Sequence, residues 1–288
     1  MKNIIVSYFS GSRNLGIMLK GMIIGGTMLV PGVSGGTMAM ILGIYDELIG
    51  SVSSFMKHKG ESFRFLLLFT AGGSLGMFLF SHPILYLIER FTMPALFFFM
   101  GAVAGGVPFI FRKAELKRFS WRGALYLAAG IAIVITVSAI PVNGSDTEMA
   151  GDMKSSLFLA AAGIAAAAAL VLPGISVSYL LLIMGLYDET MAAISQVYTP
   201  FLIPLATGLV LGIIMTSKLL ERAMLRFPQP AYLMILGFVL GSLEEVFPGL
   251  PRGGDIPLCL LTFSVGALAI LRFSLGKHEK KPAGLTAD

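Results

Sequence analysis

The stretch that decides the fold is LVPGVSGGTMAMILGIYDE, residues 29–47, because the chain repeats it 142 positions later as VLPGISVSYLLLIMGLYDE, residues 171–189. Each copy places a Pro-Gly pair, followed two residues later by a serine, inside a long apolar segment. Interrupted hydrophobic segments in corresponding halves of a chain are a strong sequence indication of a transporter binding site. The aligned positions include Pro31 with Pro173, Gly32 with Gly174, Ser34 with Ser176, Gly43 with Gly185, and Tyr45-Asp46-Glu47 with Tyr187-Asp188-Glu189.

The similarity continues beyond the motif at an offset of 136 positions. It pairs glycines four residues apart on apolar segments, a spacing that permits close contact between membrane helices. We therefore read the chain as two copies of one unit and predict that these glycines pack helices within each copy and between the copies. The glycine pairs are Gly72/Gly76 with Gly208/Gly212, and Gly101/Gly105 with Gly237/Gly241.

The composition is that of a membrane protein. Of 288 residues, 56% are hydrophobic and only 13% are charged, whereas soluble domains carry roughly 25% charged residues. The sequence predicts an all-α integral membrane protein with no separate soluble domain and an N-terminal segment that is retained. A single cysteine, Cys259, gives no basis for an internal disulfide or a metal cluster. We expect no cofactor and no nucleic-acid partner, and we attribute the net charge of +5 to membrane topology.

Two kinds of apolar segment are present. Six continuous runs approach the ~20 residues that span a bilayer. The two segments that contain the repeated motif are instead broken by Pro-Gly into two arms of about 15 residues, or ~22 Å each. Such a segment is compatible with two crossings, one kinked crossing, or a re-entrant hairpin. The continuous runs are 65–88, 94–111, 122–140, 200–220, 230–247 and 256–273, and the broken segments are 15–49 and 157–192.

The positions of Lys and Arg favour the hairpin. With two hairpins and a cytoplasmic N-terminus, 18 of the 21 basic residues lie inside, as the positive-inside rule requires. A first segment that crossed once would place Lys57, Lys59 and Arg64 opposite the basic N-terminus. The external side keeps only three basic residues, Arg90, Lys154 and Arg252, and it also holds the acidic loop 143–152.

A hairpin plus three spans is an odd number of crossings, so the second copy is predicted to be inverted relative to the first. The prediction is two inverted-topology repeats, each a re-entrant helical hairpin plus three transmembrane helices, with the hairpin tips meeting near the midplane. Both termini are then cytoplasmic. The boundaries are repeat 1 at 1–140, an external acidic loop at 141–156, repeat 2 at 157–274 and a cytoplasmic tail at 275–288.

The tips carry anion-binding chemistry. A helix start offers unpaired amides and the positive end of a dipole, glycines let a ligand approach the backbone, and hydroxyls donate to a phosphate. The first tip keeps paired glycines and is predicted to be the better phosphate cradle. The alternative is a tight turn with capping serines. The proposed phosphate-binding residues are Gly32, Ser34, Gly35, Gly36, Thr37, Gly174, Ser176 and Ser178, and the hairpin breaks are Pro31 and Pro173.

Acidic residues follow each hairpin, at what we expect to be the end of its second arm. Negative charge at a helix C-terminus is slightly unfavourable, so its repetition suggests a role. The carboxylates are candidates for binding a coupling proton or cation, for clamping the arms to basic neighbours, or for simple solvation. These coupling candidates are Asp46, Glu47, Asp188 and Glu189.

Three further ionisable residues lie in or near apolar segments. His82 is a candidate for function or for the membrane interface. Glu244 and Glu245 have no acidic match in the first copy, where Pro108 and Phe109 align, and an outward-facing charge and a cation site both stay open.

The run GMIIGGTMLVPGVSGGTMAMILGIYDELI, residues 21–49, with its degenerate second copy, resembles a bacterial and archaeal family of polyprenyl-phosphate translocases of the PopT type, long catalogued as a domain of unknown function. The resemblance covers essentially the whole chain. It implies return of undecaprenyl phosphate from the outer to the inner leaflet of the cytoplasmic membrane, inverted repeats and re-entrant hairpins.

Burying a phosphate without partners is costly, so we expect amides, hydroxyls and one basic side chain to replace its water. The expected partners are the polyprenyl phosphate and membrane lipids.

One alternative function is an ion-coupled transporter of a small soluble anion, and a less favoured one is an intramembrane lipid phosphatase. The chain lacks the motifs of common hydrolases and nucleotide-binding enzymes, so we expect a transporter and not an enzyme.

Overall fold

The computed structural model describes residues 2–30, 33–114, 121–140 and 153–275, and the regular structure in these ranges is helical. Four of the six apolar runs predicted from the sequence lie within single helices, the run 122–140 extends two residues beyond the end of α6, and the run 230–247 is divided. The helices are α1 (Lys2–Thr27), α2 (Gly35–Ile41), α3 (Tyr45–Ser53), α4 (Lys59–Arg90), α5 (Thr92–Lys113), α6 (Trp121–Ser138), α7 (Met153–Val171), α8 (Val177–Ile183), α9 (Tyr187–Ser195), α10 (Thr199–Arg226), α11 (Pro228–Gly241), α12 (Leu243–Val246) and α13 (Asp255–Leu275).

Five of these helices, α4, α5, α6, α10 and α13, are long and apolar enough to cross a membrane. The helix expected over 230–247 differs, because it divides at Ser242 into α11 of 14 residues and α12 of four. The Ser242 hydroxyl donates to the Val239 carbonyl at 2.9 Å. Side-chain bonds of this local kind compete with the helical ladder and are typical of helix ends and bends.

The second arm of each broken segment is also divided. We expected one helix of about 15 residues, but α2 and α3 follow the first break and α8 and α9 follow the second, with a bend of 112° between α8 and α9. The cause is Gly43 and its equivalent Gly185, which have positive φ angles of 61° and 67°. Glycine adopts this left-handed conformation without the steric cost that other residues meet.

The hydrogen bonds at both glycines are those of a Schellman helix end. The Gly43 amide donates to the Met40 carbonyl at 3.0 Å, and the following Ile44 amide donates to the Ala39 carbonyl at 3.0 Å. Equivalent amides of the second copy, on Gly185 and Leu186, donate at 3.0 and 2.8 Å. The two copies therefore stop their short helices by the same device.

Equivalent helices pack in equivalent ways within the two halves, α1 on α4 and α7 on α10. A Cβ built on Gly72 would lie 2.2 Å from the Met18 carbonyl oxygen, and one on the equivalent Gly208 would lie 2.0 Å from that of Ala160. Met18 and Ala160 are themselves 142 positions apart, which is the offset of the repeated motif. The predicted glycine packing within each copy is confirmed.

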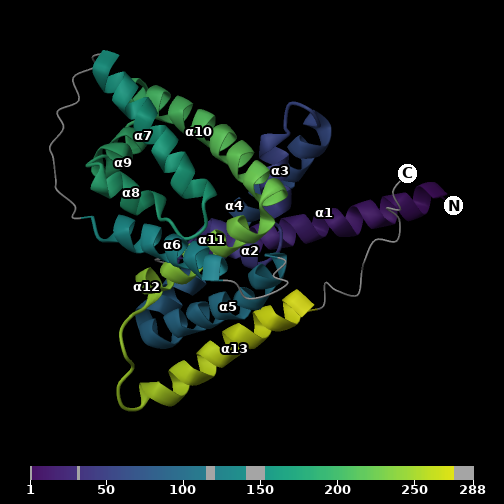
Figure 1. The fold of residues 1–288 in the computed structure, drawn as a ribbon, viewed down its shortest axis with the longest axis vertical. Helices are drawn as coiled ribbons and strands as arrows, with labels where there is room; N and C mark the ends of the chain where they lie inside the picture. The colour runs from purple at the N-terminus through teal and green to yellow at the C-terminus, as the bar shows by residue number, and fades with distance from the viewer. Residues whose placement is uncertain (1, 31–32, 115–120, 141–152, 276–288) are drawn as a thin grey trace.

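The remaining long helices pair between the halves. Helix α5 of the first half packs along α13 of the second, and α6 of the first packs along α11 of the second (Figure 1). A Cβ on Gly101 would lie 2.0 Å from the Phe263 carbonyl oxygen, and one on Gly237 would lie 2.3 Å from that of Leu127. The glycine contacts between the copies are therefore also confirmed, and they are reciprocal.

The two broken segments differ in burial. In α2 the five residues from Thr37 to Ile41 are all buried, and the last four of them join the main hydrophobic core with residues of α5 and α11. In α8 only Leu181 is buried, and it belongs to a smaller cluster with α7, α9 and α10. Helix α2 is therefore set into the protein, whereas α8 lies nearer its surface, although Pro173 and Gly174 just before α8 are buried.

Candidate functional site

A cavity of about 620 Å³ lies where the two breaks meet. This volume is within the ~300–1,000 Å³ typical of ligand pockets. Its lining mixes apolar side chains with hydroxyls and one carboxylate, and both copies of the repeated motif contribute. The residues that line it are Met28, Leu29, Val30, Val33, Ser34, Gly35, Ala169, Leu170, Gly174, Ile175, Ser176, Val177, Ser178, Tyr187 and Glu245.

The helices that follow the first break contact the second break. A Cβ on Gly36 would lie 3.3 Å from the Pro173 Cα, so this glycine lets the first break approach the second. The Tyr45 hydroxyl donates to the Val171 carbonyl at 2.6 Å. Such a carbonyl at a helix end has no partner within its own helix. Residues that follow the first break therefore lie against residues of the second, while Pro31 and Gly32 lie outside the described residues. That the two segments are re-entrant tips meeting near the midplane stays a prediction.

The predicted hydroxyls have three different environments. Ser34 begins α2 without a side-chain capping bond, so its hydroxyl is available at the cavity. Ser176 caps α8 by accepting from the Tyr179 amide at 3.3 Å, while Ser178 lies exposed in the cavity wall. Thr37 is buried, with a hydroxyl that lacks a hydrogen-bond partner, and does not belong to the lining.

The glycines of the breaks are placed by packing as well. Gly174 lines the cavity with a φ of +82°, and a Cβ there would lie 2.2 Å from the Phe238 carbonyl oxygen of α11. A Cβ on Gly35 would instead meet the side chain of Met28, with its sulfur at 2.8 Å. Gly174 is therefore required by the fold, whereas the space beside Gly35 is occupied by a movable side chain.

The cavity contains a carboxylate that the repeated motif did not reveal. Glu245 on α12 is half-buried, and its Oε1 accepts a hydrogen bond from the Ser138 hydroxyl at 2.9 Å. The basic side chain that we expected is absent from the described lining, which contains neither Lys nor Arg. The sequence left the role of Glu245 undecided between an outward-facing charge and a cation site, because the first copy has no acidic residue at the equivalent position.

The acidic residues after each break are not where the sequence placed them. We expected them at a helix C-terminus, but Asp46 and Glu47 lie in the first turn of α3, and Asp188 and Glu189 in the first turn of α9. The helix breaks at Gly43 and Gly185 cause the difference. Negative charge is favourable at a helix N-terminus, so the position itself explains part of the repetition.

The first pair forms a clamp between helices. Asp46 forms an ion pair with Lys113 at the end of α5 and accepts a hydrogen bond from the Tyr232 hydroxyl of α11 at 3.1 Å. Its neighbour Glu47 lies 3.8 Å from Arg13, with both side chains largely exposed. Asp46 therefore ties α3 to one helix of each half.

The second copy has no equivalent of this arrangement at Asp188. The positions that correspond to Lys113 and Tyr232 are Gly249 and Leu96, and neither side chain can pair with a carboxylate. Asp188 is exposed, and its neighbour Glu189 lines a separate cavity of about 200 Å³ between α9 and α10. None of the four acids lines the central cavity.

The other ionisable candidates lie away from the cavity. His82 is exposed on α4, outside the lining of the central cavity. Among the residues that the structure describes, no group of three or more His, Cys, Asp or Glu side chains is placed to hold a metal ion.

The apolar helices, the two equivalent halves and the shared cavity define a multi-pass membrane protein with a central polar site. Residues 24–252 match the profile of a family described as undecaprenyl phosphate translocase-like. The chain is 38% identical over 247 residues to a polyprenyl-phosphate transporter of Staphylococcus aureus, covering 81% of this chain and 86% of the relative. It is 29% identical over 249 residues to a polyprenyl-phosphate transporter of Vibrio cholerae, covering 81% and 78%.

The chain belongs to the undecaprenyl phosphate translocase-like family. This membership confirms the resemblance drawn from the two break motifs. No solved structure shows a significant match to this chain.

Proposed function

We propose that this protein is a lipid-carrier translocase that returns undecaprenyl phosphate from the outer to the inner leaflet of the cytoplasmic membrane. The observation that carries the proposal is one cavity shared by the segments that flank both breaks, lined by hydroxyls from both segments. Family membership and two relatives named polyprenyl-phosphate transporter supply the substrate class.

The phosphate head binds in the central cavity. Ser34 and Ser178 donate hydroxyls from the two breaks, and Tyr187 adds a third from α9. The apolar part of the lining, which includes Leu29 and Leu170, suits the first isoprene units. The rest of the prenyl chain stays among lipid tails, where its transfer into protein brings no gain.

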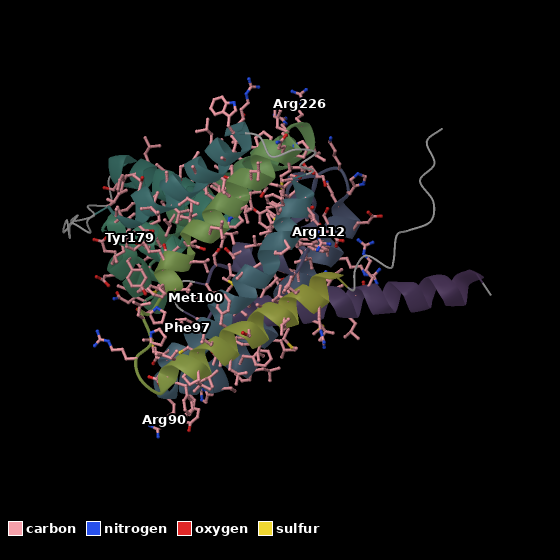
Figure 2. The ribbon with its side chains drawn as sticks, turned by 60° about the horizontal axis from the view of Figure 1, so that its bottom comes forward. Arg90, Phe97, Met100, Arg112, Tyr179 and Arg226 are labelled. Atoms are coloured by element: carbon pink, nitrogen blue, oxygen red, sulfur yellow. The ribbon has the colours of Figure 1, made fainter. Side chains whose placement is uncertain are left out.

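The topology we propose places α1–α3 and α7–α9 as re-entrant segments of two inverted repeats, with both termini cytoplasmic. The distribution of basic residues supports it. Arg112 and Arg226 belong to the cytoplasmic set and Arg90 to the external set. Figure 2 shows Arg90 at one end of the molecule and the other two well away from it.

Transport of undecaprenyl phosphate in proteoliposomes, measured separately in each leaflet, tests the proposal. We expect the purified protein to move the lipid, and a Ser34→Ala, Ser178→Ala double variant to bind it more weakly. Hydrogen bonds to charged groups contribute about 1.5–3 kcal/mol each, so the loss of binding should be tenfold or more. Ser195→Ala is the matched control, because Ser195 is an exposed serine of α9 outside the cavity.

The same preparation separates the rivals. Uptake of inorganic phosphate without lipid movement would indicate a transporter of small soluble anions. Release of inorganic phosphate from the lipid would indicate a phosphatase. Either result, with no movement of undecaprenyl phosphate between leaflets, contradicts the proposal.

A further inference from the structure

The central cavity contains a carboxylate, which carries a negative charge when ionised and would then repel an anion. Among the described residues that line the cavity, Glu245 is the one carboxylate, and neither Lys nor Arg is present. An ionised carboxylate and a phosphate in one partly dehydrated space repel each other by several times the energy they would have in water. Binding of the phosphate and ionisation of Glu245 are therefore antagonistic.

The carboxylate is held in place by both halves of the protein. The Ser138 hydroxyl, at the end of α6, donates to it at 2.9 Å. The Tyr179 hydroxyl of α8 in turn donates to the Ser138 carbonyl at 2.7 Å and to the Ile140 carbonyl at 3.1 Å. Glu245 also borders a second small space together with Gly174, Ser176 and Tyr179, so it lies directly beside the second break.

The charged and titratable groups around Glu245 are few. Glu244 is its exposed neighbour on α12, Tyr179 lies on α8, and Tyr187 shares the cavity from α9. Helix α11 has no charged residue, and its Tyr232 is bonded to Asp46. Helix α5 has basic residues only in its last turn, and Figure 2 shows Arg112 of that turn far from Tyr179. No cation of the described lining neutralises Glu245.

We propose that Glu245 is the proton-binding site that couples transport to the proton gradient: it takes up a proton when the phosphate enters the cavity and releases it when the phosphate leaves. This inference rests on the proposed function and identifies its coupling group. The proton comes from water on the side where the lipid enters and returns to water on the side where it leaves, so charge and atoms balance. Thermodynamic reciprocity then requires that protonation tighten phosphate binding by the same factor.

Asp46 is less suited to this role than Glu245, although it was a coupling candidate in the sequence. Its charge is already neutralised by Lys113, and it does not line the cavity. A coupling group must change its ionisation as the ligand arrives, and Glu245 is the carboxylate that the ligand would meet.

The variant that tests this is Glu245→Gln, which mimics the protonated acid and retains an oxygen for the Ser138 hydroxyl. We measure binding of undecaprenyl phosphate from pH 5 to pH 8, and proton uptake from a weakly buffered solution when the lipid is added. The wild type should take up protons and bind more weakly as pH rises. The variant should take up fewer protons and bind about tenfold more tightly than wild type at pH 8, with similar affinity at pH 5.

Two further variants control the result. Glu244→Gln removes the same charge one residue away and should keep the pH response, shifted slightly to lower pH by the loss of a neighbouring negative charge. Ser138→Ala keeps the acid but removes a hydrogen bond that favours its ionised form, so the pH midpoint should move upward. This second variant remains informative if Glu245→Gln fails to fold.

The inference is overturned if Glu245→Gln binds the lipid with the wild-type pH response and the wild-type proton uptake, or if Glu244→Gln abolishes both. In those cases lipid movement by the wild type leaves the proposed function standing. If the wild type neither binds nor moves undecaprenyl phosphate at any pH, the proposed function fails and this inference fails with it.

Discussion

Replacing Asp46 with Asn tests whether this acid is a structural clamp or a coupling group. The substitution removes the charge that pairs with Lys113 but keeps the shape of the side chain. Asp188→Asn is an unusually close control. Asp188 occupies the equivalent position in the first turn of α9, so both variants lose the same favourable interaction with a helix N-terminus, worth about 0.3–1 kcal/mol.

The difference between the two variants therefore reports the contacts that Asp46 makes with Lys113 and Tyr232 and that Asp188 lacks, chiefly the charge pair with Lys113. The side chains of Lys113 and Asp46 are 26% and 40% exposed, so water screens the pair in part. Exposed ion pairs contribute about 0.2–1 kcal/mol, and hydrogen bonds to charged groups about 1.5–3 kcal/mol. We expect the contact to contribute about 1 kcal/mol, between an exposed pair and a buried one.

Thermal unfolding in detergent, followed by the fluorescence of the single tryptophan, measures the effect. One kcal/mol corresponds to a Tm decrease of about 2–4 °C in a chain of this size, so Asp46→Asn should unfold that much below Asp188→Asn. Transport by Asp46→Asn should fall with stability and stay dependent on pH. Equal Tm values for the two variants would refute the clamp, and a stable Asp46→Asn protein that ignores the pH gradient would identify Asp46 as a coupling acid.

The remaining predictions concern topology and packing. In a background without the native cysteine, Glu61→Cys should react with an impermeant reagent only from the cytoplasm and Arg252→Cys only from outside, and the reverse pattern would remove the basis for inverted repeats. Gly76→Ala should destabilise the protein by about 1–3 kcal/mol, because its Cβ would lie 2.0 Å from the Met22 carbonyl oxygen. Gly16→Ala on α1, with open space around its Cβ, should unfold no earlier than wild type. Tyr45→Phe should cost about 1–3 kcal/mol by leaving a buried carbonyl without its donor, and an unchanged Tm would contradict that bond.

Much of the helical framework could be predicted because hydrophobicity and glycine spacing act locally. Apolar length locates the long helices, and the glycines that contact carbonyl oxygens could be found as pairs four residues apart. The Schellman ends at Gly43 and Gly185 were also accessible, since a glycine that stops a helix is a known signal. The prediction did not treat these two glycines as helix ends. It therefore placed the following acids at a helix C-terminus, whereas they lie in the first turn of the next helix.

The composition of the cavity could not be predicted by the same means. Glu245 lines the cavity although it lies on a short helix outside the repeated motif. Thr37 belongs to the motif but is buried away from the cavity. Both outcomes depend on how α12 and α2 pack against α5, a contact between segments far apart in the chain. The sequence duplication identifies equivalent positions, but it does not predict where equivalent residues have different structural surroundings.

The pairing of α5 with α13 and of α6 with α11 restricts how this protein can change shape. Each pair joins one helix from each half through contacts between glycines and backbone carbonyls, which cannot slide without separating. The two halves therefore cannot separate as rigid bodies while these contacts last. A rearrangement that preserves these contacts keeps α5, α6, α11 and α13 together as one frame.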